Sequence, residues 1–253
     1  MAKRKRKTRP PRIMRKKKID IILERILRAN TPYGISKDSF DKLIVQNAKD
    51  KRVFEHALTI LSRPLRALLR LNIIYDEMLL LFRIAHLFPW KGVMTKFQHM
   101  HFVWLLFVNL CYSFEEKFKL YANEHNAALK SFGLTGGVDI KTGIKKIDSN
   151  LREHIRNRGE QMHEWRKTHD ALDDFAIIEL AATLEKGTKE INSEQAYRMA
   201  KIIVAGEIRS AIAFLELFLM EVVTNHEKEL LPISKKIVDT LKALKAHNSV
   251  APD

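Results

Sequence analysis

Glycine and proline are scarce in this chain, which has nine glycines and seven prolines among its 253 residues. Average proteins hold about 7% glycine and about 5% proline. Folds with many strands need both residues at their tight turns, because glycine supplies positive φ and proline presets the turn backbone. Apolar residues also recur at helical spacing, as at Ile19, Ile22, Leu23 and Ile26. We therefore expect an all-α fold.

Interruptions of the apolar pattern set the expected helix ends. Pro64 fits the first turn of a helix, where its missing N–H costs nothing, and Gly159 separates two helical patterns. Residues 131–143 carry four of the nine glycines and are expected to form a loop. The pattern before this loop is apolar nearly all round over residues 101–112, which predicts a helix that is surrounded by protein. The expected helices cover residues 19–30, 51–62, 64–87, 96–130, 144–158, 160–185, 193–230 and 232–247, with one more starting at Ser36.

Charge is concentrated at the N-terminus. Residues 1–18 hold eleven basic side chains and no acidic one, so only +4 of the formal net charge of +15 remains for the other 235 residues. A segment with so few apolar residues cannot build a core and is expected to be a disordered tail. We interpret it as an arm that binds nucleic-acid phosphates; the alternative is a targeting or solubilising extension. Its basic residues are Lys3, Arg4, Lys5, Arg6, Lys7, Arg9, Arg12, Arg15, Lys16, Lys17 and Lys18.

These patterns divide the chain into four expected parts. The tail ends where the helical spacing begins, and the break at residues 88–92 separates an N-terminal helical region from the long helix that follows. Pro232 precedes a more weakly patterned final helix. The expected parts are a basic tail (1–18), an N-terminal helical region (19–90), a helical bundle (91–231), and a C-terminal helix and tail (232–253).

Cysteine content and hydropathy indicate the compartment. The single cysteine, Cys111, excludes an internal disulfide and suits a reducing environment, where we expect it to act as a small apolar core residue. The longest apolar run, residues 102–112, is far shorter than the about 20 residues that span a bilayer. We therefore expect a cytoplasmic protein that does not enter the membrane.

Basic residues and histidines gather between Leu151 and Asp174. Before Gly159, helical geometry predicts an apolar stripe of Ile144, Ile147, Leu151 and Ile155. The same geometry puts a different, polar face at Lys145, Ser149, Arg152 and Arg156. This stretch is the part of the sequence that most suggests a functional site.

Arg156 and His163 are the candidate pair within this stretch. If the helix continues through Gly159, seven residues bring them within about 20° of one another and about 10.5 Å apart along the axis. Arg158 would lie about 140° from His163, so it could join them only if Gly159 bends or breaks the helix.

This residue pair suits RNA cleavage without a metal. The reaction removes a proton from the ribose 2′-OH, protonates the leaving 5′-oxygen and stabilises extra negative charge on phosphorus. An imidazole with a pKa near neutrality serves the two proton transfers, and a permanently charged guanidinium serves the third need. The required 2′-OH restricts the substrate to RNA.

The pair also resembles a family motif. Arg156-Asn157, followed by His163 after five more residues, is similar to the motif of HEPN-domain proteins, in which four to six residues separate an arginine from a histidine. Those proteins are all-helical bundles, and many are metal-independent endoribonucleases of toxin–antitoxin and abortive-infection systems. In active members two domains meet and share one composite site.

The resemblance implies roles for particular residues. Arg156 and His163 would be catalytic, Asn157 would orient them, and Arg158 also satisfies the spacing. A HEPN-like bundle would bind RNA, form a homodimer, need no cofactor and have an antitoxin or other inhibitor protein as a possible partner. Glu160 and His163 also fit the E-x-x-H spacing of di-iron bundles, but the second copy is absent, so no metal is expected.

Asn109 and Glu116 are candidate supporting residues on the long helix. Family members often place a polar residue from an earlier helix near the pair, and these two lie on one helix face. The alternative is that Asn109 bonds locally and Glu116 is solvated. The alternative function for the whole chain is a non-catalytic helical protein that binds nucleic acid or a partner through its basic arm.

Overall fold

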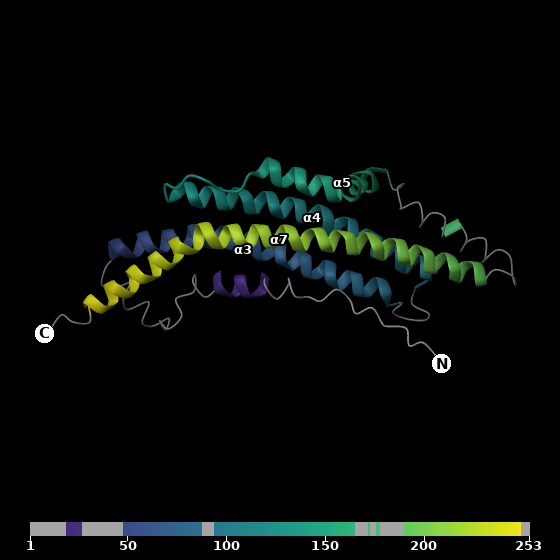
Figure 1. The fold of residues 1–253 in the computed structure, drawn as a ribbon, viewed down its shortest axis with the longest axis horizontal. Helices are drawn as coiled ribbons and strands as arrows, with labels where there is room; N and C mark the ends of the chain where they lie inside the picture. Colours follow the sequence, from purple (N-terminus) through teal and green to yellow (C-terminus); the bar gives the residue numbers. More distant parts are fainter. Residues whose placement is uncertain are drawn as a thin grey trace, which may run out of the picture. The chain divides into compact units, whose positions relative to one another are not determined.

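The computed structural model describes residues 19–26, 48–87, 94–164, 172, 176–177 and 190–248. Within these residues all regular secondary structure is helical, so the expected all-α fold is confirmed (Figure 1). The four long helices are α3 (Ala48–His86), α4 (Lys96–Ser131), α5 (Ile140–Glu164) and α7 (Glu190–Asn248). A short helix covers residues 19–26.

Several predictions fall outside the described residues. These are the basic tail, the helix expected from Ser36 and most of the helix expected over 160–185. In the part of the chain that is described, no helix is long and apolar enough to cross a membrane.

Residue contacts divide the chain into two units. The central unit is residues 63–215, and the terminal unit combines residues 1–62 with 216–253. Both boundaries lie inside helices, α3 and α7, whereas the sequence-based boundaries at residues 90 and 231 follow breaks in the apolar pattern. Within the terminal unit, Arg25 forms an ion pair with Glu227 over 2.8 Å. The candidate site described below lies in the central unit.

Two prolines lie inside helices instead of at their ends. Pro64 is within α3 and Pro232 is within α7, so the separate helices expected on either side of each proline were wrong. A proline in a helix interior removes one backbone hydrogen bond and crowds the preceding turn. The neighbouring residues Leu65 and Leu231 are buried. Burial of the apolar face through each proline offsets its local cost, which sequence spacing alone does not measure.

Helix α4 follows its prediction closely in extent but not in burial. It begins with a capping box, in which Thr95 Oγ1 accepts from Gln98 N (3.1 Å) and Gln98 Oε1 accepts from Thr95 N (2.8 Å). The expectation that residues 101–112 are surrounded on all sides was wrong, because Phe102 is 46% exposed and Asn109 is exposed. Instead one face is buried along nearly the whole helix, including Met100, Val103, Trp104, Phe107, Cys111, Phe114, Phe118, Tyr121, His125 and Leu129.

The connection from α4 to α5 is the expected glycine-rich loop. Gly133, Gly136 and Gly137 have φ of 68°, 125° and 120°, a region that side chains with a Cβ rarely adopt. Asn126 fastens this loop to α4, since its side-chain nitrogen donates to Val138 O (2.9 Å) and its oxygen accepts from Val138 N (2.8 Å). The fourth glycine of the stretch, Gly143, belongs to α5.

Helix α5 packs antiparallel along α4 (Figure 1). Gly143, near the start of α5, lies against the buried ring of Phe118, where a Cβ at Gly143 would be 2.2 Å from Phe118 Cζ. Farther along, the ring of His154 meets Phe107 edge-on with 4.7 Å between centroids. The absent side chain at Gly143 therefore lets the two helices approach closely. The predicted apolar stripe is confirmed, with Ile147 and Leu151 buried and Ile144 and Ile155 half-buried.

Candidate functional site

The backbone of α5 carries the predicted catalytic pair. The helix runs unbroken from Ile140 to Glu164, so the break expected at Gly159 was wrong. One glycine costs a helix only about 1 kcal/mol relative to alanine, which does not end it. Arg156 and His163 are therefore seven positions apart on one helix, as the spacing argument requires. Arg158 is five positions before His163, about 140° around the axis.

The side chains of these residues lie outside the described part of the chain. This applies to Arg156, Asn157, Arg158 and His163, whose backbone alone is placed. Their roles therefore remain predictions. The basic tail, also predicted to bind nucleic acid, is outside the described residues altogether.

The solvent face of α5 leads toward the predicted pair. Lys145, Ser149 and Arg152 are all exposed, which confirms the polar face over this part of the helix. At 100° per residue, Lys145, Arg152, Arg156 and His163 fall within an arc of about 40°. We call Lys145, Arg152 and position 156 the α5 basic line. Over residues 145–152, the side of α5 that carries these cations is thus exposed to solvent.

The candidate supporting residues of α4 differ in their placement. Glu116 pairs with Lys119 over 2.9 Å and precedes Phe118, which lies against Gly143. Arg156 is thirteen positions beyond Gly143 on α5, about 20 Å along a helix axis. Asn109 is exposed and is two positions from Phe107, whose ring contacts His154. The described structure thus brings Asn109 closer than Glu116 to the end of α5 that holds the pair.

Glu116 shares its cation with a neighbour. Lys119 Nζ lies 2.6 Å from Glu115 Oε1 as well as 2.9 Å from Glu116 Oε1. The hydrogen bonds that Lys119 donates to Glu115 and Glu116 raise the pKa of Lys119. The alternative expectation for Glu116, that it is a solvated surface carboxylate, matches its partial exposure.

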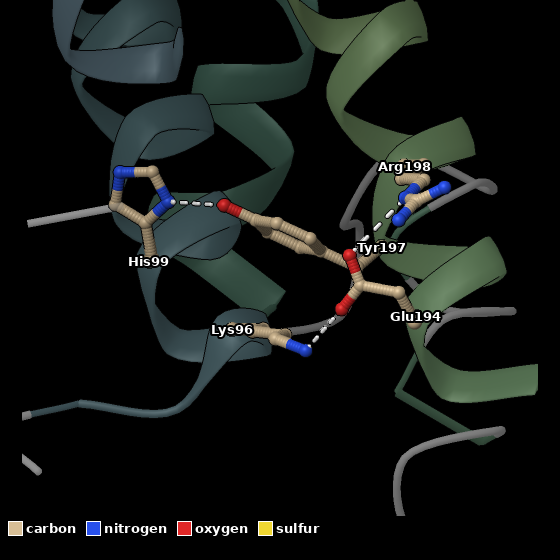
Figure 2. A network of polar contacts seen from close by, with 5 residues as sticks. All are labelled: Lys96, His99, Glu194, Tyr197 and Arg198. Atoms are coloured by element: carbon tan, nitrogen blue, oxygen red, sulfur yellow. Dashed lines mark hydrogen bonds and ion pairs between the residues drawn. The ribbon is translucent and has the colours of Figure 1, made fainter. Parts of the chain in front are cut away.

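A polar network that the sequence did not indicate joins α4 to α7. Figure 2 shows Tyr197 extending from α7 toward the ring of His99 on α4, with the phenol oxygen and His99 Nδ1 3.4 Å apart. His99 Nε2 lies 3.2 Å from the backbone oxygen of Ile84, near the end of α3. His99 is 1% exposed. One buried imidazole therefore connects three helices of the central unit.

The hydrogen bonds of His99 define its protonation. A carbonyl oxygen only accepts, so Nε2 carries the proton and donates to Ile84. Nδ1 is then the acceptor for the phenol of Tyr197. Burial lowers the pKa of His99, and the charge of Lys201 lowers it further against the opposing hydrogen bond to Ile84. Burial and the nearby Glu194 carboxylate raise the pKa of Tyr197, so both side chains of the pair are neutral at pH 7.

An ion-pair cluster flanks this buried contact. Glu194 binds Lys96 of α4 and also accepts from Arg198 Nε over 3.2 Å (Figure 2). The hydrogen bond from Lys96, followed by that from Arg198, lowers the pKa of Glu194. Lys96 Nζ also lies 5.7 Å from the ring centroid of Tyr197. Because Glu194 and Arg198 are well exposed, we regard the cluster as a positioning device with little effect on stability.

Lys201 connects the network to α3. Its Nζ donates to the backbone oxygen of His86 over 2.7 Å, at the last residue of α3. A cation at this position satisfies a terminal carbonyl and complements the negative end of the helix dipole. The network thus holds the end of α3 beside the starts of α4 and α7.

Replacing Tyr197 by phenylalanine is expected to lower the free energy of unfolding by about 1 kcal/mol, because His99 Nδ1 loses its donor inside the core. Chemical denaturation followed by circular dichroism measures the change. Arg198→Ala, which removes only an exposed ion pair, is the control and should change stability by less than about 0.5 kcal/mol. Equal stability of Tyr197→Phe and the parent would mean that the 3.4 Å contact contributes nothing.

Sequence reasoning missed this network because its members are far apart in the chain. His99 and Tyr197 are 98 positions apart. The only local signals are the Thr95 capping box before His99 and the four-residue spacing of Glu194 and Arg198. Neither signal identifies the partner across the helix interface.

Among the described residues, neither the cysteine nor any group of metal-binding side chains forms a candidate reactive site. Cys111 is fully buried, and burial raises the pKa of its thiol, which agrees with the expected role as a core residue. Among the side chains that are placed, no three histidine, cysteine, aspartate or glutamate residues cluster in a way that could hold a metal ion.

Comparisons with protein families, with curated proteins and with solved structures find no match to this chain.

Proposed function

We propose that this chain is a metal-independent endoribonuclease of the HEPN type. The observation that carries the proposal is the unbroken course of α5 through Gly159, which keeps positions 156 and 163 on one helix face. The all-helical structure, in which α5 packs along α4, agrees with the resemblance. The exposed cations Lys145 and Arg152, on the same side of α5, add a favourable potential for a phosphate backbone.

The proposed reaction divides its tasks between two side chains. His163 takes the proton of the ribose 2′-OH while the 2′-oxygen attacks phosphorus. The bond to the 5′-oxygen then breaks, and that oxygen receives a proton from an imidazolium. Arg156 neutralises the charge that develops on the phosphoryl oxygens. The products are a 2′,3′-cyclic phosphate and a 5′-hydroxyl, so that protons and bonds balance without a co-reactant.

The resemblance extends the proposal to the assembly. A homodimer would place two copies of Arg156 and His163 in one composite site, with Asn157 orienting the groups. Size-exclusion chromatography with light scattering measures the dimer directly. A cytoplasmic toxin or abortive-infection protein held by an inhibitor would be the corresponding biological role.

The test is incubation of the purified chain with labelled RNA in EDTA, beside Arg156→Ala and His163→Ala. We expect cleavage with cyclic phosphate ends in the parent and a loss of at least about 100-fold in each variant, the usual contribution of a catalytic acid, base or charge stabiliser. The chain supplies a matched control, because His56 and Arg63 are exposed and also seven positions apart on one helix, α3.

The double variant His56→Ala/Arg63→Ala should retain the parent activity. RNA binding without cleavage by the parent would instead support the non-catalytic alternative. Cleavage that requires a divalent metal would contradict the proposed mechanism.

A further inference from the structure

The exposed face of α5 has a charge arrangement that the reaction chemistry does not itself require. Lys145 and Arg152 are exposed and seven positions apart, about 10.5 Å along the helix axis. Ser149 is exposed between them, but its hydroxyl donates to the backbone oxygen of Lys146 (2.9 Å) and accepts from Asn150 Nδ2 (3.0 Å). The half-buried Asp148 lies to one flank, about 60° from Lys145.

Lys145 and Arg152 differ from several other basic residues in that no carboxylate of the described residues pairs with them. Lys96, Lys119 and Arg198 each bind a carboxylate of the protein. Among the described residues, neither Lys145 nor Arg152 forms an ion pair. Within the described part of the chain, an external anion would therefore meet these two charges without displacing a carboxylate of the protein.

The position of the cations along α5 indicates the kind of anion. A line of separated charges on one helix face matches a repeating anion better than a single one, because each charge meets a successive group. The line continues in the helical register to position 156. A chain of phosphates lying along α5 would therefore reach the predicted cleavage residues at its far end.

We propose that Lys145 and Arg152 form a phosphate-binding track on which the RNA backbone lies along α5 as it reaches the Arg156–His163 pair. The direction of the strand toward this pair depends on the proposed function, whereas the binding itself does not. Contacts to phosphates position the RNA and carry no sequence information. The track therefore contributes affinity and register, and leaves base preference to other residues.

The test measures binding of a fluorescent RNA oligonucleotide by the full-length chain in EDTA, with His163→Ala as the background so that the probe stays intact. Lys145→Glu/Arg152→Glu is the track variant. Lys228→Glu/Lys235→Glu is the matched control, since these lysines are exposed, are seven positions apart on α7 and give the same change of charge. The basic tail is present in every variant, so its contribution is common to all of them.

Loss of two phosphate contacts on a single strand is expected to reduce the slope of log affinity against log salt by about 1.4. Relative to 1 M salt, this corresponds to a loss of about 25-fold in affinity at 0.1 M salt. The control should stay within about twofold of the background chain, because its positions lie off the track. Circular dichroism of each variant checks that the exposed substitutions leave the helices folded.

Equal weakening by the track variant and the control would overturn the proposal, because it would mean that net charge alone governs binding. Unchanged RNA affinity, with loss of binding to phosphatidylserine vesicles, would overturn it in favour of a membrane surface.

Cleavage separates the track from the proposed activity. In the parent with His163 intact, the track variant should raise KM and keep kcat at saturating RNA. Lost binding in a chain that never cleaves RNA would support the track and refute the endoribonuclease.

Discussion

Gly143→Ala is expected to destabilise the central unit by about 2 kcal/mol, the scale of overpacking a well-filled core. The new Cβ would lie 2.2 Å from Cζ and 2.4 Å from Cε1 of Phe118. Phe118 is 1% exposed, so its ring has no open space to enter. The clash should exceed the gain of about 1 kcal/mol that alanine brings to a helix. Urea denaturation followed by circular dichroism measures the net change.

A second helical glycine serves as the control. Gly206 of α7 is exposed, and a Cβ there would have no atom within 4 Å. Gly206→Ala should therefore raise the free energy of unfolding by about 0.5–1 kcal/mol, the ordinary helix preference. If Gly143→Ala lowers the free energy of unfolding and Gly206→Ala raises it, the cost at Gly143 comes from the contact with Phe118 and not from the helix backbone.

A double substitution tests the contact itself. Phe118→Leu removes the outer ring atoms, at a cost of about 1–2 kcal/mol for the lost packing. If the clash is the cause, the double variant Gly143→Ala/Phe118→Leu should lose less stability than the sum of the losses in the two single variants. The expected difference is about 1–2 kcal/mol. If the stability losses simply add, or if Gly143→Ala is as stable as the parent, α4 and α5 can move apart at this contact without cost.

Acid is expected to destabilise the central unit through His125. Its side chain is fully buried in α4, and burial lowers its pKa from 6.5 to about 4 against a smaller opposing hydrogen bond with Asn126. The unfolded chain takes up a proton here as the pH falls below 6.5, whereas the folded chain does so only near pH 4. The stabilisation is thus complete above pH 6.5 and declines down to pH 4, by about 3 kcal/mol in total.

The variant His125→Gln isolates this contribution because glutamine does not titrate. Between pH 7 and pH 4 its free energy of unfolding should fall by about 3 kcal/mol less than that of the parent. The difference between the two pH profiles is the measured quantity, so the cost of the substitution at neutral pH cancels. His99, whose pKa is also lowered, acts in the same direction and is common to both chains. Parallel profiles would contradict the buried neutral imidazole.

The apolar face of α5 shows how much of the site was predictable. Four positions assigned inward from their spacing, including Ile147 and Leu151, are buried or half-buried, and Lys145 and Arg152 on the other face are exposed. A helix imposes a fixed angle per residue, so the spacing of apolar side chains is enough to identify its two faces. The pairing of His99 with Tyr197 was not predictable, because no local pattern relates residues 98 positions apart.

Local periodicity and glycine content by themselves determined that the chain is helical, where α4 lies, that a glycine-rich loop follows it, and which side of α5 packs inward. The tertiary structure alone decided that helices continue through Pro64, Gly159 and Pro232, and that Gly143 permits the close approach of α5 to Phe118. Residue preferences measure the local cost of such positions. At Pro64 and Pro232 the helix continues because apolar neighbours such as Leu65 and Leu231 are buried, and that contribution is larger than the local cost. At Gly159 the local cost is only about 1 kcal/mol, too small to end the helix.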